Sequence, residues 1–324
     1  AAGAAAGCGA SAPARCHGGD HSHGNLPSRW QHDHNDGGHH LLFGVPKKGR
    51  LYEQVKSMLH GAGIEYVRKD RVDIAHCSNL PMSVVFLPAK DIPTYVGEGD
   101  VDLGITGEDC IAESEADIDV LMQLGLGKCN LSVQGPREEH LKAESLAGRR
   151  IVTSFPKLAQ KFFASLEEPG KPTQIKCISG SVEAAIGLGL ADGIVDLVET
   201  GTTMRAAGLE EVAVVMKSQT VLIANPKTRH KELVDVLRRR ISGYLTAQSW
   251  VMVTYNIHRM NLKRAEQITP GKRSPSVQPL EEDNWVAVSS MVRKRDAAHV
   301  MDELEAVGAR DILLTSLLST RLGE

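Results

Sequence analysis

Short apolar runs alternate with stretches of helical periodicity from about residue 41 onward. Residues 41–45 and 84–87 are continuous apolar runs, and 101–105 is apolar except for Asp102, as is typical of strands that are buried on both faces. Between them, residues 51–61 carry apolar side chains at the three- and four-residue spacing of a helix. Strands that alternate with helices predict an α/β fold with parallel or mixed sheets.

A second set of similar elements follows. Residues 151–152 and 194–198 are expected to be strands, and Pro156 opens an expected helix that runs through Phe163. Residues 220–224 are expected to form a strand that returns to the first set. The chain therefore predicts two α/β lobes of similar build.

One seven-residue motif occurs in both predicted lobes. Val101-Asp-Leu-x-x-Thr-Gly107 matches Val195-Asp-Leu-x-x-Thr-Gly201 position by position. Ligands of open parallel sheets lie at the carboxyl ends of the strands. We therefore expect the two Thr-Gly turns to face each other across a cleft.

The pattern changes after a long predicted helix at 231–250. The expected order is then strand, helix, strand, strand, helix, strand, at residues 250–257, 262–267, 276–280, 285–291, 295–307 and 311–317. This βαββαβ order is that of the ferredoxin-like unit. A small appended domain of this kind indicates regulation or assembly more than chemistry.

Four regions follow from these patterns. Residues 1–40 are rich in Ala, Gly and His and are expected to be a disordered tail. Residues 41–129 plus about 222–249 form the first lobe, 130–221 the second lobe, and 250–324 the appended domain. The tail has no apolar core of a signal peptide, but a processed transit segment remains open because the sequence starts at Ala1.

Composition narrows the class of protein. The chain has 324 residues, 42% of them hydrophobic and only 4% aromatic, so its cores should consist mainly of aliphatic side chains. A net charge of −3 argues against general nucleic-acid binding, and no apolar run is long enough to span a bilayer. The six cysteines include no Cys-x-x-Cys pair, which favours reduced thiols in a cytoplasmic protein.

The strongest candidate site is the segment from Gly193 to Met204. A short strand enters a loop with Thr200, Gly201, Thr202 and Thr203, and a helix starts near its end. Unpaired backbone N–H groups at a helix start, with nearby hydroxyls, suit a phosphate. Asp196 and Glu199 add carboxylates that suit ribose hydroxyls, although in a straight strand they lie on opposite faces. The simpler alternative is an ordinary strand-to-helix turn with a capping threonine.

Several stretches together identify a family resemblance. They are residues 42–52, 86–99, 102–107, 151–155, 179–183, 195–208 and 285–291, and Glu183 occupies the glutamate position of the family signature. The chain resembles the ATP phosphoribosyltransferases of the long, self-regulated type, the fungal members in particular. The resemblance implies a periplasmic-binding-protein-like catalytic core of two lobes, followed by an ACT-like regulatory domain.

The resemblance also implies a reaction. N1 of ATP attacks C1 of phosphoribosyl pyrophosphate, with Mg²⁺, to give phosphoribosyl-ATP and pyrophosphate in the first step of histidine biosynthesis. Histidine would inhibit by binding the C-terminal domain, and the chain would assemble into dimers and hexamers. Adenine N1 carries a lone pair and no proton, so the reaction needs no strong general base. Positioning and charge stabilisation are then expected to lower the barrier.

Further site residues follow from the resemblance and from their place after strands. The basic turn is expected to bind the leaving pyrophosphate through Lys47, Lys48, Gly49 and Arg50. Contacts to ATP are expected from the first lobe's turns and from a second-lobe helix start, at Lys90, Asp91, Thr106, Asp109, Thr153 and Ser154. For all of these ATP residues except Lys90, helix capping is an equally good interpretation.

Two other classes of function compete. A two-lobed protein that binds a small molecule without catalysis shares the fold, because fold alone does not fix function. A catalytically inactive regulatory subunit is the other. The acid-flanked Thr-Gly-Thr-Thr loop, the intact basic turn and the appended domain favour the enzyme over both.

Overall fold

The computed structural model describes residues 40–69, 72–139 and 141–321. Its first sheet has six strands in the order β2-β3-β1-β4-β11-β5. Their bounds are β1 Leu41–Pro46, β2 Ile74–His76, β3 Met82–Leu87, β4 Leu103–Gly107, β5 Asp119–Gln123 and β11 Thr220–Ala224. β1 pairs in parallel with β3 and β4, whereas β2, β11 and β5 join antiparallel, so the sheet is mixed.

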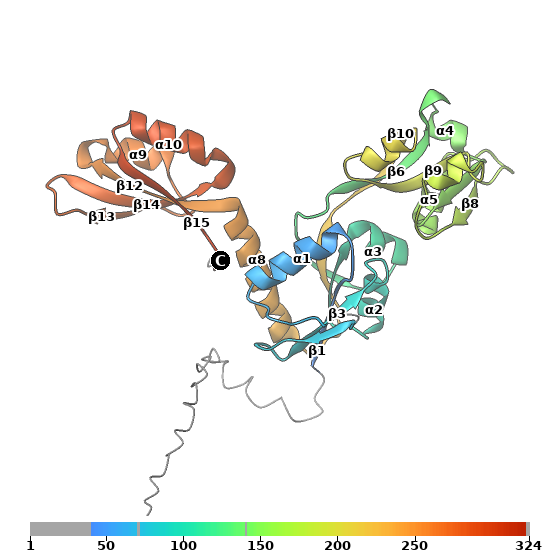
Figure 1. Cartoon of the computed structure of the whole chain (residues 1–324), viewed down its shortest axis with the longest axis horizontal. Helices are drawn as coiled ribbons and strands as arrows, with labels where there is room; N and C mark the ends of the chain where they lie inside the picture. The colour runs from blue at the N-terminus through green and yellow to red at the C-terminus, as the bar shows by residue number, and fades with distance from the viewer. Residues whose placement is uncertain (1–39, 70–71, 140, 322–324) are drawn as a thin grey trace, which may run out of the picture.

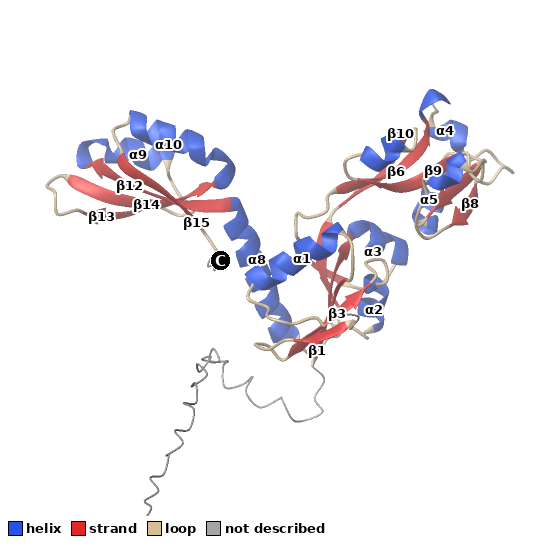
Figure 2. Cartoon of the chain, viewed as in Figure 1, coloured by secondary structure: helices blue, strands red, loops and turns tan. Residues whose placement is uncertain are grey.

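Helices cover both faces of this sheet (Figure 2). They are α1 Arg50–Gly61, α2 Ile92–Glu98, α3 Glu108–Ser114 and α8 Lys231–Ser249. The apolar sides of α1 and α8 pack with one face of the sheet around Phe43 and Phe86. On the other face, Ile92 and Val96 of α2 pack with Val221 and Ile223 of β11. Strands buried on both sides explain the continuous apolar runs of the sequence.

The second sheet has five strands in the order β10-β6-β9-β7-β8. The elements of this lobe are β6 Cys129–Pro136, η2 Arg137–Glu139, α4 Ala143–Leu146, β7 Arg150–Thr153, α5 Pro156–Ala164, β8 Gln174–Cys177, α6 Ala184–Gly187, β9 Gly193–Val198, α7 Thr202–Ala206 and β10 Leu209–Ser218. β7 runs parallel to β8 and β9, and β6 and β10 add antiparallel strands. Phe163 of α5 packs on one face and Val182 and Ala185 on the other.

The chain crosses between the two sheets at two places (Figure 1). Residues 124–128 lead from β5 to β6, and Gln219 alone separates β10 from β11. The predicted return of residues 220–224 to the first lobe is confirmed, since β11 pairs with β4 and β5. Two lobes joined by two crossings form the periplasmic-binding-protein-like core that the sequence predicted.

The last part of the chain forms a separate four-stranded antiparallel sheet. Its elements are β12 Trp250–His258, η3 Arg259–Asn261, α9 Leu262–Ile268, β13 Ser276–Pro279, β14 Trp285–Arg293, η4 Lys294–Asp296, α10 Ala297–Ala306 and β15 Arg310–Ser316. The order β13-β14-β12-β15 is the ferredoxin-like order, as predicted. Alternate residues of β12 and β14 are buried against α9 and α10 in a core of their own.

Some expectations differ from the structure or fall outside it. The predicted disordered tail, apart from His40, lies outside the described residues. Asp91 takes the expected position before α2 but makes no capping hydrogen bond with its side chain among the described residues. None of the helices in the described part of the chain has the length and apolar composition needed to span a bilayer.

Candidate active site

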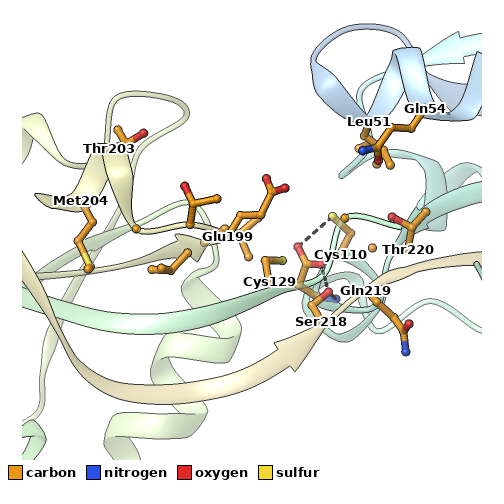
Figure 3. Close-up of a pocket in the computed structure, with 18 of the residues that line it drawn as sticks. Leu51, Gln54, Cys110, Cys129, Glu199, Thr203, Met204, Ser218, Gln219 and Thr220 are labelled. Atoms are coloured by element: carbon orange, nitrogen blue, oxygen red, sulfur yellow. Dashed lines mark hydrogen bonds between the residues drawn. The ribbon is translucent and has the colours of Figure 1, made fainter. Parts of the chain in front are cut away.

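A cavity of about 350 Å³ lies between the two lobes (Figure 3). Its first-lobe wall comes from the start of α1, the turns after β3 and β4, the start of α3 and the segments where the chain crosses between the sheets. The residues are Leu51, Gln54, Ala89, Gly107, Asp109, Cys110, Gly127 and Thr220. Its second-lobe wall is the segment from Leu197 to Met204. Gly107 and Gly201 both line the cavity, so the two Thr-Gly turns do face each other as expected.

The second-lobe wall is built by the end of β9. The strand stops at Val198, and Gly201 has φ 71°, a left-handed conformation that favours glycine. This residue turns the chain into α7, whose first residues Thr202 and Thr203 are exposed. The Thr200 and Thr202 hydroxyls lie 3.0 Å apart, and Arg205 donates to the Thr200 carbonyl at 2.9 Å. The loop thus keeps a fixed shape and presents hydroxyls beside the cavity.

The two acidic residues predicted for this part of the site lie in different places. Glu199 lies in the bend after β9 and lines the cavity. Asp196 lies within β9, outside the cavity wall, and its carboxylate accepts the Leu197 N–H at 2.8 Å. Burial raises the pKa of Asp196 above its usual value, and the charge of nearby Glu183 raises it further. The bend therefore brings Glu199, but not Asp196, to the cavity in this arrangement.

Asp109 is a nearly fully buried part of the first-lobe wall. Its carboxylate accepts from the Ser218 hydroxyl and lies 3.5 Å from the Cys110 thiol, and its N–H donates to the Ser218 oxygen at 3.1 Å. Ser218 is the last residue of β10, directly before the crossing to β11. Asp109 therefore joins α3 to the crossing as well as lining the cavity.

The hydroxyls of two threonines predicted for the site already form hydrogen bonds within the protein. The buried Thr106 donates to the Ala89 carbonyl at 2.6 Å. The buried Thr153 donates to the Val195 carbonyl at 2.7 Å and accepts the Phe155 N–H at 2.9 Å. Neither Thr106, Thr153 nor Ser154 lines the described cavity. Thr153 does not cap α5 itself, because its hydroxyl accepts the N–H of Phe155, the residue before the helix.

Lys47, Lys48 and Gly49 of the basic turn are not among the described residues that line the cavity, and the side chain of Arg50 lies outside the description. Lys47 pairs with Asp73 at 3.8 Å, and its carbonyl accepts from Arg68 at 3.3 Å. Lys48 and Gly49 are exposed, and α1 follows them and supplies Leu51 and Gln54 to the wall. In the turn after the neighbouring strand β3, Ala89 lines the cavity and Lys90 is exposed, and Asp91 then precedes α2.

Sequence reasoning missed several cavity residues, some on α1 and α3 and others near the two crossings. They include Leu51, Gln54, Cys110, Cys129, Ser218, Gln219 and Thr220. Burial raises the pKa of the Cys110 thiol to about 12 and that of Cys129 to about 11. Both thiols therefore stay protonated near neutral pH and are poor nucleophiles. The signal that would have found Cys129, Ser218, Gln219 and Thr220 is the place where the chain leaves one sheet for the other.

Fold and cavity together define a two-lobed α/β protein with a hydroxyl-rich loop on an interlobe cavity. The sequence profile of the family "ATP phosphoribosyltransferase" matches residues 88–243, and that of "HisG, C-terminal domain" matches residues 247–319. This chain belongs to the ATP phosphoribosyltransferase family. This match does not favour the alternative of a binding protein without catalysis.

Individual relatives agree with this assignment. The chain is 47% identical over 296 residues to an ATP phosphoribosyltransferase of Candida glabrata, covering 87% of this chain and 97% of the relative. The corresponding enzyme of Saccharomyces cerevisiae is 48% identical over 288 residues, with the same coverage. A solved ATP phosphoribosyl transferase (HisG:HisZ) complex from Thermotoga maritima is 27% identical, with a TM-score of 0.54, and covers 62% of this chain and 98% of its own.

Proposed function

We propose that this protein transfers the 5-phosphoribosyl group of phosphoribosyl pyrophosphate to N1 of ATP. The products are phosphoribosyl-ATP and pyrophosphate, in the first step of histidine biosynthesis. The observation that carries the proposal is the Glu-Thr-Gly-Thr-Thr loop at 199–203, which faces the Gly107 turn across the interlobe cavity. Family membership supports the same reaction.

The chemistry proposed needs positioning more than proton transfer. The N1 lone pair forms the new bond to C1 as the bond from C1 to the pyrophosphate oxygen breaks, and pyrophosphate keeps the electron pair. Two substrates held on opposite walls of one cavity gain the advantage of an intramolecular reaction. The hydroxyls of Thr200, Thr202 and Thr203 would hold the 5-phosphate, and Glu199 would accept from the ribose hydroxyls.

Pyrophosphate would leave toward the basic turn. Lys47, Lys48 and Arg50 follow β1 at the same edge of the first sheet as the Gly107 turn. Their charges would stabilise the negative charge that develops on the leaving group. Lys90 and Asp91, at the end of the neighbouring β3, would contribute to ATP binding from the same edge.

We further propose that Mg²⁺ takes part. Among the described residues, no group of three or more His, Cys, Asp or Glu side chains is placed to hold a metal ion. Mg²⁺ commonly binds through one or two carboxylates plus substrate phosphates, and Glu199, which lines the cavity, would supply such a carboxylate. The ion would neutralise charge on the departing pyrophosphate.

Regulation and assembly are proposed from the family and the domain order. Histidine would bind the ferredoxin-like domain and inhibit the enzyme, and the chain would form homodimers and hexamers. A cytoplasmic location fits a biosynthetic enzyme with free thiols, while a processed transit segment would place it in an organelle. The family match to the C-terminal domain supports the regulatory role of residues 250–324.

A direct assay tests the proposed reaction. Purified protein with ATP, phosphoribosyl pyrophosphate and Mg²⁺ should form phosphoribosyl-ATP, followed by its absorbance and by released pyrophosphate. Thr203→Val should lower kcat/KM for phosphoribosyl pyrophosphate roughly 10- to 100-fold, because a hydrogen bond to a charged phosphate contributes about 1.5–3 kcal/mol. ATP binding, measured by calorimetry, should remain.

Thr94→Val is the matched control, since Thr94 is an exposed residue of α2 outside the cavity wall. It should behave like the unmodified protein. Full activity of Thr203→Val would remove the phosphate assignment of the loop. A folded protein that binds both substrates without forming product would contradict the proposed enzymatic activity.

A further inference from the structure

Two carboxylates of the first lobe reach a helix of the second lobe. Glu113, in α3, accepts the Lys157 N–H at 2.9 Å through Oε1 and the Leu158 N–H at 3.0 Å through Oε2. Glu115, directly after α3, accepts from the Lys157 ammonium at 2.9 Å and from Lys161 at 2.6 Å. All four interactions join α3 to α5, and so one lobe to the other.

The start of α5 is built to receive such a partner. The residue before the helix is Phe155, whose side chain has no oxygen to accept from the first turn, and Pro156 follows. The next two N–H groups, of Lys157 and Leu158, have no acceptor within the helix itself. A carboxylate is well suited to this position, because it accepts both bonds and lies at the positive end of the helix dipole. Glu113 therefore caps α5 from the opposite lobe.

The helices that these bonds join, α3 and α5, both lie close to the cavity: α3 forms part of its wall, and α5 follows a strand that neighbours the other wall. α3 begins directly after Gly107, and its first turn supplies Asp109 and Cys110 to the first-lobe wall. α5 begins after β7, the parallel neighbour of β9, whose end carries the threonine loop. The distance between α3 and α5 thus helps to determine the distance between the two walls.

We propose that Glu113 and Glu115 are positioning residues that form an interlobe brace. The brace, defined by these two residues and by Lys157, Leu158 and Lys161, would hold the lobes at the separation that the two substrates require. The crossings at 124–128 and at Gln219 leave room for a hinge motion that such contacts restrict. Its role in substrate binding rests on the function proposed above; its role in lobe separation does not.

Two properties of Glu115 fit this role. Its φ of 58° is left-handed, a conformation that glycine or asparagine usually supplies after a helix. A glycine here would relieve the backbone but lose both ion pairs. Hydrogen bonds from Lys161 and Lys157 lower the pKa of Glu115 to about 2, so it stays charged at neutral pH. An exposed pair alone contributes little, and the backbone bonds of Glu113 make the brace more than a surface ion pair.

A distance measurement tests the brace without substrates. Spin labels are placed on Cys177 and on Glu98→Cys, exposed positions of the second and first lobes, in a Cys8→Ser/Cys16→Ser background. Labelled chains are diluted with unlabelled chains so that each distance lies within one chain. The unaltered brace should give one narrow distance distribution, and Glu113→Ala/Glu115→Ala should give a broader or displaced one. An unchanged distribution would overturn the proposal, whatever the activity.

Kinetics then test the consequence for substrates. Glu113→Ala/Glu115→Ala should raise KM for both substrates about tenfold or more while changing kcat less, because the residues touch neither substrate. Glu168→Ala is the matched control, since it breaks an exposed 2.7 Å ion pair with Lys171 inside the second lobe. It should leave both constants unchanged. An equal KM effect in the control would contradict an interlobe role.

A charge reversal separates the brace from a general loss of stability. Glu115→Lys places a cation against Lys157 and Lys161 and should broaden the distances and raise KM. Adding Lys157→Glu and Lys161→Glu restores opposite charges across the gap and should recover at least half of both effects. Absence of recovery in a chain with an unchanged melting temperature would count against pairing between the lobes.

Discussion

Asp102 ties three segments of the first lobe together at the end of β4 that lies away from the cavity. Its carboxylate accepts the Leu42 N–H at 2.9 Å and the Thr228 hydroxyl at 2.6 Å. Its carbonyl accepts the Asn225 N–H at 2.9 Å. The residue occupies the same place in the repeated seven-residue motif as Asp196. Its hydrogen bonds all join segments of its own lobe.

Asp102→Ala is expected to lower the free energy of unfolding by roughly 2–4 kcal/mol. Two hydrogen bonds to a charged carboxylate are lost, and a backbone N–H is left without its partner. Denaturant titration measures the change. KM for both substrates should stay the same, and the neighbouring exposed Asp100→Ala should change neither quantity by much. A variant that is as stable as the parent but inactive would assign Asp102 to the site.

Single residues also show where sequence reasoning stops. The place of the threonines at 200–203 in the cavity wall was predictable, because acidic residues and a glycine accompany several hydroxyls between a strand and a helix. Thr106 and Thr153 stand in similar local sequences, but their hydroxyls point to carbonyls of neighbouring segments. Those carbonyls come from distant parts of the chain, so local pattern alone does not reveal the choice.

Between elements, α1 and α8 pack at very close range. A Cβ on Gly61, the last residue of α1, would overlap the ring of Tyr244 in α8. Next to it, Arg240 donates to the Gly63 carbonyl at 2.9 Å. Arg240, the last residue of the basic run at 238–240, is half-buried, so this run is not wholly a solvated face. Its guanidinium satisfies the backbone just after α1.

Gly61→Ala should lower the free energy of unfolding by about 1–3 kcal/mol, as for other substitutions that overfill a packed contact. The ring of Tyr244 has to move, and its packing on α1 weakens. Gly187→Ala is the control, because a Cβ there meets nothing within 4 Å and alanine favours the helix. Thermal and denaturant unfolding measure both. Equal stability of the two variants would mean that the helices separate at little cost.

The strands of the two lobes were predictable in proportion to their burial. β1, β3, β4, β9 and β11 are apolar runs inside the sheets and were expected within a few residues. β2, β5 and β8 were missed, since they are short strands at or near sheet edges with mostly exposed residues. β6 was missed for another reason: its sequence mixes Asn, Ser and Gln into a buried strand. Ser132 and Gln134 are tolerated there because they bond to Glu211 and to the Asp196 carbonyl.

At the scale of the whole molecule, the chain consists of a two-lobed core and a domain with its own core. The side chains packed around Tyr255 and Val288 form a cluster separate from those of the lobes. α8 leads from the first lobe directly into β12, and the chain returns at Thr320 to lie against Gly243 of α8. The general plan was predictable from element order and family resemblance. This return contact was not, because a glycine inside a helix does not indicate which segment packs against it.

Truncation after Ser249 is expected to keep the transferase reaction and remove inhibition by histidine. The cut falls between α8 and β12, leaves the buried clusters of both lobes intact and removes the C-terminal cluster as a unit. Circular dichroism and a melting curve first establish that the shortened chain is folded. Rates of phosphoribosyl-ATP formation are then compared with and without histidine. A folded, active and still inhibited truncation would place the effector site within the lobes, and the ferredoxin-like domain would then be left with a role in assembly.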